Sequence, residues 1–167
     1  MTYRHVATAV LMGGLLGGAL DLLFAVSFAG YNGVPVVRVF QTIASGLLGS
    51  SAYAGGNASA ALGVLCHFTL AVGWAAVFAG LAAWKPALLR SRLLCAVLFG
   101  LGVFLAMRLV VLPLSAYPRP VTFAPLASTL DLLSHMFLFA GPIVAFTSRA
   151  ITGPDGRLSP GAARRPA

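Results

Sequence analysis

Acidic residues are scarce in this 167-residue chain, which has three Asp and Glu in total against eleven Lys and Arg. Charged residues of both signs make up 8% of the sequence, whereas a typical soluble domain has about 25%. Long polar stretches are missing as well, since the longest one, residues 149–167, is too short to form a hydrophobic core. These deficits exclude a large soluble catalytic domain.

Motifs of the common enzyme classes are also lacking. The sequence has no Gly-x-Ser-x-Gly element, no phosphate-binding loop and no dinucleotide fingerprint, so we expect no enzymatic activity. The two cysteines, Cys66 and Cys95, fall at depths too different for a disulfide. Few basic residues remain to form a patch once the apolar runs are set aside, so the net charge of +8 does not indicate nucleic-acid binding.

Apolar sequence dominates the chain, with 59% hydrophobic residues and a mean hydropathy of +0.95. A helix of roughly 20 apolar residues crosses the hydrocarbon core of a bilayer. Four runs are long enough, at residues 6–30, 58–84, 93–114 and 125–148. The sequence therefore predicts an all-α integral membrane four-helix bundle over residues 1–148, with the lipid bilayer as its partner and a homo-oligomer as a further possibility.

The first run has an alternative interpretation as a secretory signal peptide, because Arg4 precedes it and Ser27-Phe-Ala29 resembles a cleavage site. Its length exceeds a signal h-region of about 7–15 residues. It also carries Asp21. Both features favour a retained span.

The segments between the runs differ in kind. Apolar residues recur at helical spacing over residues 35–50, which predicts an outer interfacial helix that lies on the membrane surface or dips into it. Residues 115–124 contain two prolines and are expected to form an irregular link. The tail at 149–167 has no apolar periodicity and is expected to be disordered.

Basic residues collect on one side of the predicted bundle. Eight of the eleven precede the first run, follow the second or follow the fourth, and short loops rich in Lys and Arg stay cytoplasmic. Arg38 and Arg119 fall on the opposite side, and Arg108 lies inside the third run. We therefore predict that both termini, including the tail, are cytoplasmic.

The two halves of the chain show a possible internal repeat. Residues 62–73 match residues 130–141 at five positions, among them His67 with His135, and the first and third runs align more weakly. A duplication would produce two pseudo-repeated helical hairpins. Chance matching in a sequence rich in Leu, Ala and Gly is the other explanation, and the sequence does not decide between them.

Five ionisable residues fall inside the predicted spans: Asp21, His67, Arg108, Asp131 and His135. Such side chains usually face the bundle interior or a water-filled cavity. From a rise of 1.5 Å per residue, Asp21, Arg108 and Asp131 fall about 21–22 Å from the inner surface. The same arithmetic places the two histidines near the midplane. We predict an intramembrane polar cluster in which a charged layer lies one turn above a histidine pair.

Small residues share faces with this cluster. Gly13, Gly14, Gly17 and Gly18 lie on the same side of the first helix as Asp21, and Gly63 lies on the same side of the second as His67. Because small residues allow close helix approach, we expect these glycines to mark the packing faces.

Three roles for the cluster remain open. It can hold the bundle together, with Arg108 paired to Asp21 or Asp131, and we place this structural role first. It can form a proton-linked pathway of a small solute transporter, because His titrates near neutral pH. It can also bind a divalent metal through His67, Asp131 and His135, or a haem between the two histidines, although no established ligand motif accompanies them. We expect no cofactor.

Two short motifs carry a resemblance to a known group. The third predicted span ends in Leu112-Pro-Leu-Ser115, and the fourth contains Leu-x-x-Leu-x-His, ending at His135. Together with the four-span plan over residues 6–148, they resemble the small uncharacterised inner-membrane proteins common in bacteria. The resemblance implies a multi-pass protein of the bacterial inner membrane and supplies no catalytic residues.

Overall fold

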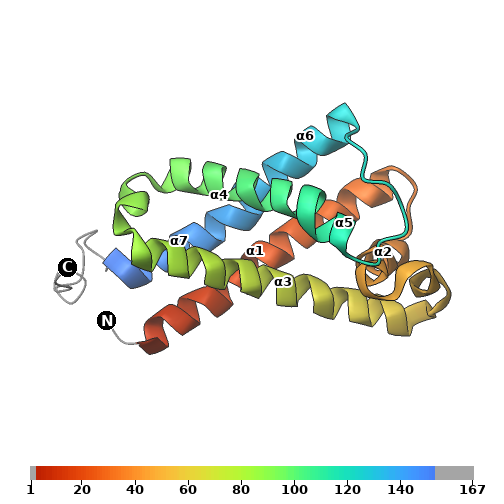
Figure 1. The fold of residues 1–167 in the computed structure, drawn as a ribbon, viewed down its shortest axis with the longest axis horizontal. Helices are drawn as coiled ribbons and strands as arrows, with labels where there is room; N and C mark the ends of the chain where they lie inside the picture. The colour runs from red at the N-terminus through yellow and green to blue at the C-terminus, as the bar shows by residue number, and fades with distance from the viewer. Residues whose placement is uncertain (1–2, 153–167) are drawn as a thin grey trace.

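The computed structural model describes residues 3–152, and over that range it contains helices and no strands. Four helices are long and apolar enough to cross a membrane, namely Arg4–Tyr31, Gly56–Trp84, Arg92–Leu114 and Pro125–Thr152. The predicted all-α class and the prediction of four helices long and apolar enough to cross a membrane are confirmed. The helices form an elongated bundle in which the first described helix, from Tyr3, begins at the same end as the last one, to Thr152, finishes (Figure 1).

The first two spanning helices are continuous, whereas the last two are interrupted. The continuous ones are α1 (Tyr3–Tyr31) and α3 (Gly56–Trp84). The third consists of α4 (Arg92–Ala106), η3 (Met107–Val111) and α5 (Leu112–Leu114). The fourth consists of α6 (Pro125–Leu133), η4 (Ser134–Phe139) and α7 (Ala140–Thr152). Both η3 and η4 are π-helical turns, which are rare and occur frequently at functional sites.

Prolines account for the two π-helical turns. A proline inside a helix lacks an N–H group, and its ring clashes with the carbonyl four residues earlier. For Pro113 that carbonyl belongs to Leu109 in η3, and for Pro142 it belongs to Leu138 in η4. A π-helical turn widens the helix at these carbonyls and relieves the clash. The sequence therefore contains a local cause for each wide turn.

Helix α1 packs between α3 and α7, and its glycines lie where the backbones approach. Gly14 and Gly18 face α3, Gly13 faces α7, and Gly17 faces the end of η4 at Phe139. A Cβ atom at Gly14 would lie 2.8 Å from the Cα of Val72, too close for any side chain. The first helix is thus packed tightly between α3 and the fourth helix, which contacts all three of the others.

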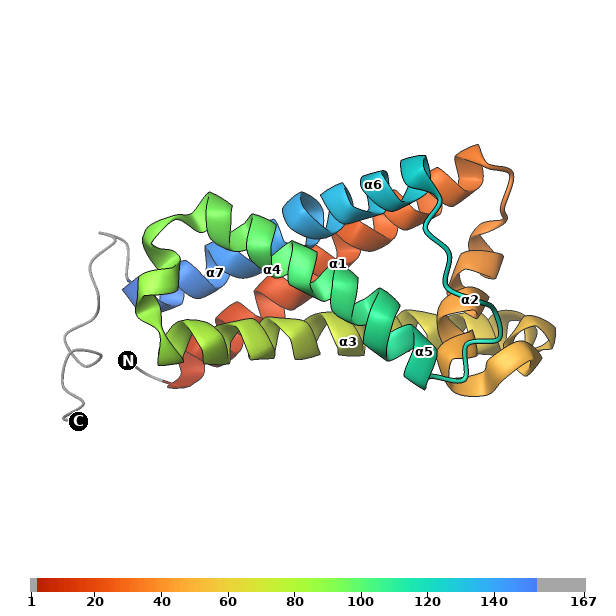
Figure 2. The same ribbon diagram turned by 45° about the horizontal axis from the view of Figure 1, so that its top comes forward.

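A shorter helix, α2 (Val36–Leu48), runs across the end of the bundle between α1 and α3 (Figure 2). It starts directly after Pro35 and is followed by a 3₁₀ turn, η1 (Gly49–Ala54). Gly63 of α3 lies against the backbone of Phe40, so α2 packs closely on α3. The helix expected at residues 35–50 is present, and it caps the end of the bundle that lies away from the termini.

The apolar core lies at the other end, among α3, α4 and α7. Its most deeply buried large side chains include Phe78, Val103, Ile143 and Ile151. Ile151 is 1% exposed, and α7 continues to Thr152, past the expected boundary at residue 148. The first residues assigned to a disordered tail are therefore helical, because Ile151 packs into the core. The rest of that predicted tail, 153–167, lies outside the described residues.

A candidate polar site inside the bundle

Arg108, in the π-helical turn η3, joins the third span to the fourth. Its Nη2 atom lies 2.9 Å from Oδ2 of Asp131, and Nη1 donates a 2.7 Å hydrogen bond to the carbonyl of Thr122. The guanidinium also lies over the rings of Phe104 and Phe123, 5.0 and 5.3 Å from their centroids. Of the two acids that the sequence left open as partners, the structure pairs Arg108 with Asp131.

Asp21 of α1 binds the other π-helical turn. The Ser134 hydroxyl in η4 donates a 2.7 Å hydrogen bond to Asp21 Oδ1, and Nδ1 of His135 lies 3.8 Å from the same oxygen. The Asp21 side chain is 13% exposed. Within residues 3–152, no ion pair joins Asp21 to an arginine, and its Oδ2 atom forms no hydrogen bond.

His135 lies between the two carboxylates. Its Nδ1 atom is 3.3 Å from Oδ1 of Asp131 and 2.9 Å from the Asp131 backbone carbonyl. The sequence prediction placed this histidine one turn beneath the charged layer. In the structure it belongs to that layer, because helical side chains lean toward the N-terminus of their helix and so carry the ring back to the acid four residues earlier.

His67 is engaged separately from these groups. Its Nε2 atom lies 2.8 Å from the backbone carbonyl of Gly18, one turn before Asp21 on α1. Among residues 3–152, no group of three or more His, Cys, Asp or Glu is placed to hold a metal ion. His67, Asp131 and His135 therefore do not form the metal-ligand set that their spacing suggested.

All five ionisable residues line one cavity of about 1000 Å³. Its walls come from α1, α2, α3, the third span, the connection at 115–124, α6 and η4. Most of the lining is apolar, and its charged groups belong to the cluster. Ser128 also lines the cavity, and its buried hydroxyl has no hydrogen-bond partner within residues 3–152. Such a group is costly unless something binds it.

The connection at 115–124 is irregular, as expected, but it is held at several points. The amide of Ala116 donates a 2.9 Å hydrogen bond to the carbonyl of Gly46 in α2. Arg119 lies over the ring of Tyr53, 5.2 Å from its centroid, and Arg38 lies over the same ring at 5.0 Å. This part of the cavity wall is therefore fixed to α2 and η1.

Sequence reasoning missed two members of the site. The sequence alone assigns Ser134 no role, yet its hydroxyl binds Asp21. The carbonyl of Thr122 was not considered, although it accepts a hydrogen bond from Arg108. The available signal for Ser134 was its position directly before His135 in a span. Nothing in the sequence indicated the role of Thr122.

Searches of protein-family models, curated proteins and solved structures find no match to this chain.

The chemistry of the site is defined by its charges. Two carboxylates and one guanidinium leave a formal charge of −1 when both histidines are neutral. A proton on His135, or a cation in the cavity, neutralises this charge.

Proposed function

We propose that this chain is a multi-pass protein of the bacterial inner membrane, with both termini in the cytoplasm. Large apolar side chains cover the outside of the bundle, among them Leu11, Leu23, Leu65 and Leu98. Soluble monomers rarely expose such continuous apolar surface. The basic residues Arg4, Lys85 and Arg149 belong to helix ends at the end of the bundle where the chain starts (Figure 1), which favours a cytoplasmic position for that end.

Insertion and orientation have a direct test. Extraction of membranes at alkaline pH leaves an integral protein in the pellet, and protease treatment of sealed inner-membrane vesicles reports which side a terminal tag occupies. We expect the chain in the pellet and both tags on the cytoplasmic side. Release into the supernatant, or tags on opposite sides, contradicts the proposal.

We further propose that the cavity binds a small solute and that binding is linked to protonation of the cluster. The observation that carries this proposal is that all five ionisable residues of the spans line a single cavity. Residues whose only role is to hold helices together gain nothing from facing open space, because a charge-assisted hydrogen bond is strongest where water is excluded. The two π-helical turns at the cavity add support, since such turns occur frequently at functional sites.

The charge of the site favours a cationic solute. The formal charge of −1 attracts a cation, and Asp21 Oδ2, which makes no hydrogen bond within residues 3–152, is an acceptor for an ammonium group. The predominantly apolar lining fits an apolar body attached to that group. We therefore expect an organic ammonium ion to bind more tightly than a carboxylate of similar size.

A structural role is the second candidate, and it applies to one half of the cluster. Arg108 bridges Asp131 and the Thr122 carbonyl and lies over two aromatic rings. These contacts hold η3, α6 and the connecting segment together. Arg108 and Asp131 thus maintain the shape of the cavity, while Asp21 and His135 face its contents.

Trp74 provides a measurement, because it lines the cavity. The chain has one other tryptophan, Trp84, which is 82% exposed, so in a Trp84→Phe protein all tryptophan fluorescence comes from Trp74. Titration with phenethylammonium in detergent is expected to change the fluorescence at pH 8 and to have a weaker effect at pH 5, where added protons remove the negative charge. Saturable binding that does not change with pH, or no binding of the cation, contradicts the proposal.

A further inference from the structure

Helices α3 and α4 are consecutive and antiparallel, yet their backbones barely approach each other. Helices joined by a short connection normally pack as direct neighbours, and only η2 (Pro86–Arg90) separates this pair. Instead, α7 packs against both of them. The arrangement leaves a gap between α3 and α4 on the outer surface of the bundle.

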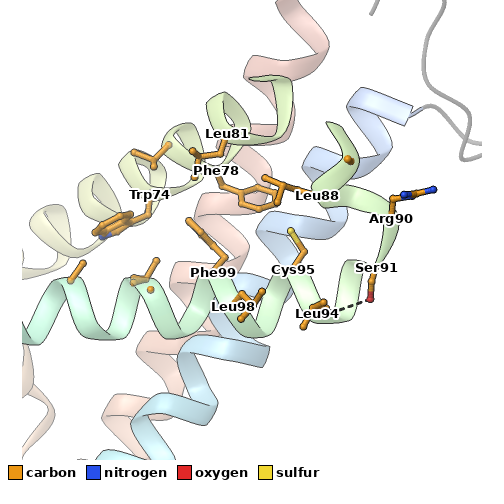
Figure 3. Close-up of a pocket in the computed structure, with 15 residues that line it drawn as sticks. Trp74, Phe78, Leu81, Leu88, Arg90, Ser91, Leu94, Cys95, Leu98 and Phe99 are labelled. Carbon is orange, nitrogen blue, oxygen red and sulfur yellow. Dashed lines mark hydrogen bonds between the residues drawn. The ribbon is translucent and has the colours of Figure 1, made fainter. Parts of the chain in front are cut away.

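The gap is an apolar groove of about 580 Å³. In Figure 3 the rings of Phe78 and Phe99 project from the two helices into the space between them, and their centroids are 4.8 Å apart. Leu94 and Leu98, on its rim, are 56% and 58% exposed. The lining is apolar except at one end, where Arg90 and Ser91 lie. Water does not stably fill an apolar space of this kind.

The groove is long enough to hold a lipid chain of one leaflet. Along α4 it extends from Ser91 to Ala106, which is about 22 Å at 1.5 Å per residue. One leaflet contributes about 15 Å of hydrocarbon. A groove that starts at the helix ends therefore reaches past the middle of the membrane, as far as Trp74 on α3.

The end of the groove is positively charged. Arg90 lines it, and Lys85 and Arg92 flank the same connection, all three exposed. The two acids of the described residues, Asp21 and Asp131, line the other cavity and do not compensate this charge. Basic residues at this level of a membrane protein attract anionic lipid head groups.

We propose that the groove between α3 and α4 binds an anionic phospholipid, with one acyl chain along Leu98 and Phe99 and the phosphate beside Arg90. The proposal rests on membrane insertion as proposed above and is independent of solute binding in the cavity. The occupant is a lipid rather than a helix of a second copy, because the groove ends at an uncompensated positive charge, which a lipid phosphate neutralises.

Two glycines provide a matched pair of variants. A side chain at Gly102, which lines the groove, meets no atom within 4 Å, and the same is true at Gly80, which does not line it. Gly102→Leu therefore directs a side chain into the groove from a position where its Cβ atom is unhindered, and Gly80→Leu makes the same change elsewhere. Arg90→Gln removes the charge at the groove end, and Arg149→Gln removes an exposed charge outside the groove.

The experiment is native mass spectrometry of each detergent-purified full-length protein after incubation with dioleoylphosphatidylglycerol or dioleoylphosphatidylcholine. We expect one phosphatidylglycerol retained by the wild-type, Gly80→Leu and Arg149→Gln proteins. Arg90→Gln is expected to lose at least tenfold of the preference for phosphatidylglycerol over phosphatidylcholine, and Gly102→Leu to lose the bound lipid. Circular dichroism confirms that each variant is helical.

Three results overturn the proposal: equal retention of both lipids by the wild-type protein, no effect of Arg90→Gln, or a wild-type dimer that Gly102→Leu converts to monomer. The last result assigns the groove to a second copy. Failure of insertion is recognised separately by release of the protein at alkaline pH. Failure of solute binding leaves these lipid measurements unchanged.

Discussion

The Ser134 hydroxyl donates a 2.7 Å hydrogen bond to Asp21 Oδ1 and so joins the fourth span to the first. The bond fixes the direction of a carboxylate whose other oxygen forms no hydrogen bond within residues 3–152 and whose side chain lines the cavity. A charge in a span is costly unless it is paired or solvated. This geometry suits an acid that receives a ligand better than one that only fastens helices together.

Replacement of Ser134 tests this contact. Ser134→Ala removes a hydrogen bond to a charged group and is expected to lower the free energy of unfolding by about 1.5–3 kcal/mol. Ser148→Ala is the matched control, because this buried hydroxyl binds only the Ala145 carbonyl of its own helix; we expect a smaller loss. Thermal unfolding in detergent measures both. Equal losses would show that the bond to Asp21 contributes nothing specific.

The pairing of Arg108 is tested by double-mutant cycles. Arg108→Gln leaves Asp131 without its cation and is expected to lower the free energy of unfolding by about 1–3 kcal/mol. Breaking a fully buried pair costs about 3–5 kcal/mol, and we expect less here because the Asp131 side chain is 33% exposed. Adding Asp131→Asn should cost less than the sum of the two single losses. Adding Asp21→Asn instead should be nearly additive. Stronger coupling of Arg108 to Asp21 than to Asp131 would refute the assigned pairing.

The close packing of α1 predicts a steric effect. Gly14→Ala places a Cβ atom 2.8 Å from the Val72 Cα, and the backbones must separate. Overpacking of this kind lowers the free energy of unfolding by about 1–3 kcal/mol. At Gly73 a Cβ atom meets nothing within 4 Å, so Gly73→Ala is expected to leave the melting temperature unchanged or raise it slightly. The prediction fails if the two variants melt alike.

The π-helical turn η4 is predicted to depend on Pro142. Pro142→Ala restores an N–H group and permits an ordinary α-helical turn, which rotates Ser134 and His135 relative to α7. We expect the melting temperature to stay the same and the affinity for phenethylammonium to fall at least tenfold, or about 1.4 kcal/mol of binding free energy. Pro125→Ala, at the first turn of α6 where proline is well tolerated, serves as the control. Unchanged affinity of the Pro142→Ala protein would show that binding does not depend on the π-helical turn η4.

The sequence predicts the number of spans well because the physical requirement is simple: about 20 apolar residues must satisfy their backbone inside lipid. The same regularity places Asp21, Arg108 and Asp131 at one level, since the helical rise is fixed. The residues at which the helices end are less predictable from the sequence. The fourth span continues to Thr152 because Ile151 packs into the core, and this contact depends on residues far away in the sequence.

The details of the site depend on rotation about each helix axis, which periodicity defines poorly in spans apolar on all sides. The choice of Asp131 rather than Asp21 for Arg108 depends on such rotation, and so does the approach of Ser134 to Asp21. Two prolines inside the predicted spans, Pro113 and Pro142, were not used to predict local distortion. Each lies four residues after a carbonyl of a π-helical turn at the cavity. The separation of α3 from α4 had no sequence signal.

The most direct test of the account compares Asp21→Asn with Asp155→Asn in the Trp84→Phe background. Both variants remove one negative charge, and Asp155 is the remaining acid of the sequence, outside the predicted spans. The measurement is the apparent Kd for phenethylammonium at pH 8 from Trp74 fluorescence, together with the melting temperature. We predict at least tenfold weaker binding for Asp21→Asn, unchanged binding for Asp155→Asn, and folded protein in both cases. Equal binding by the two variants, or a fall in the melting temperature of Asp21→Asn with no change in binding, would contradict a ligand site at Asp21.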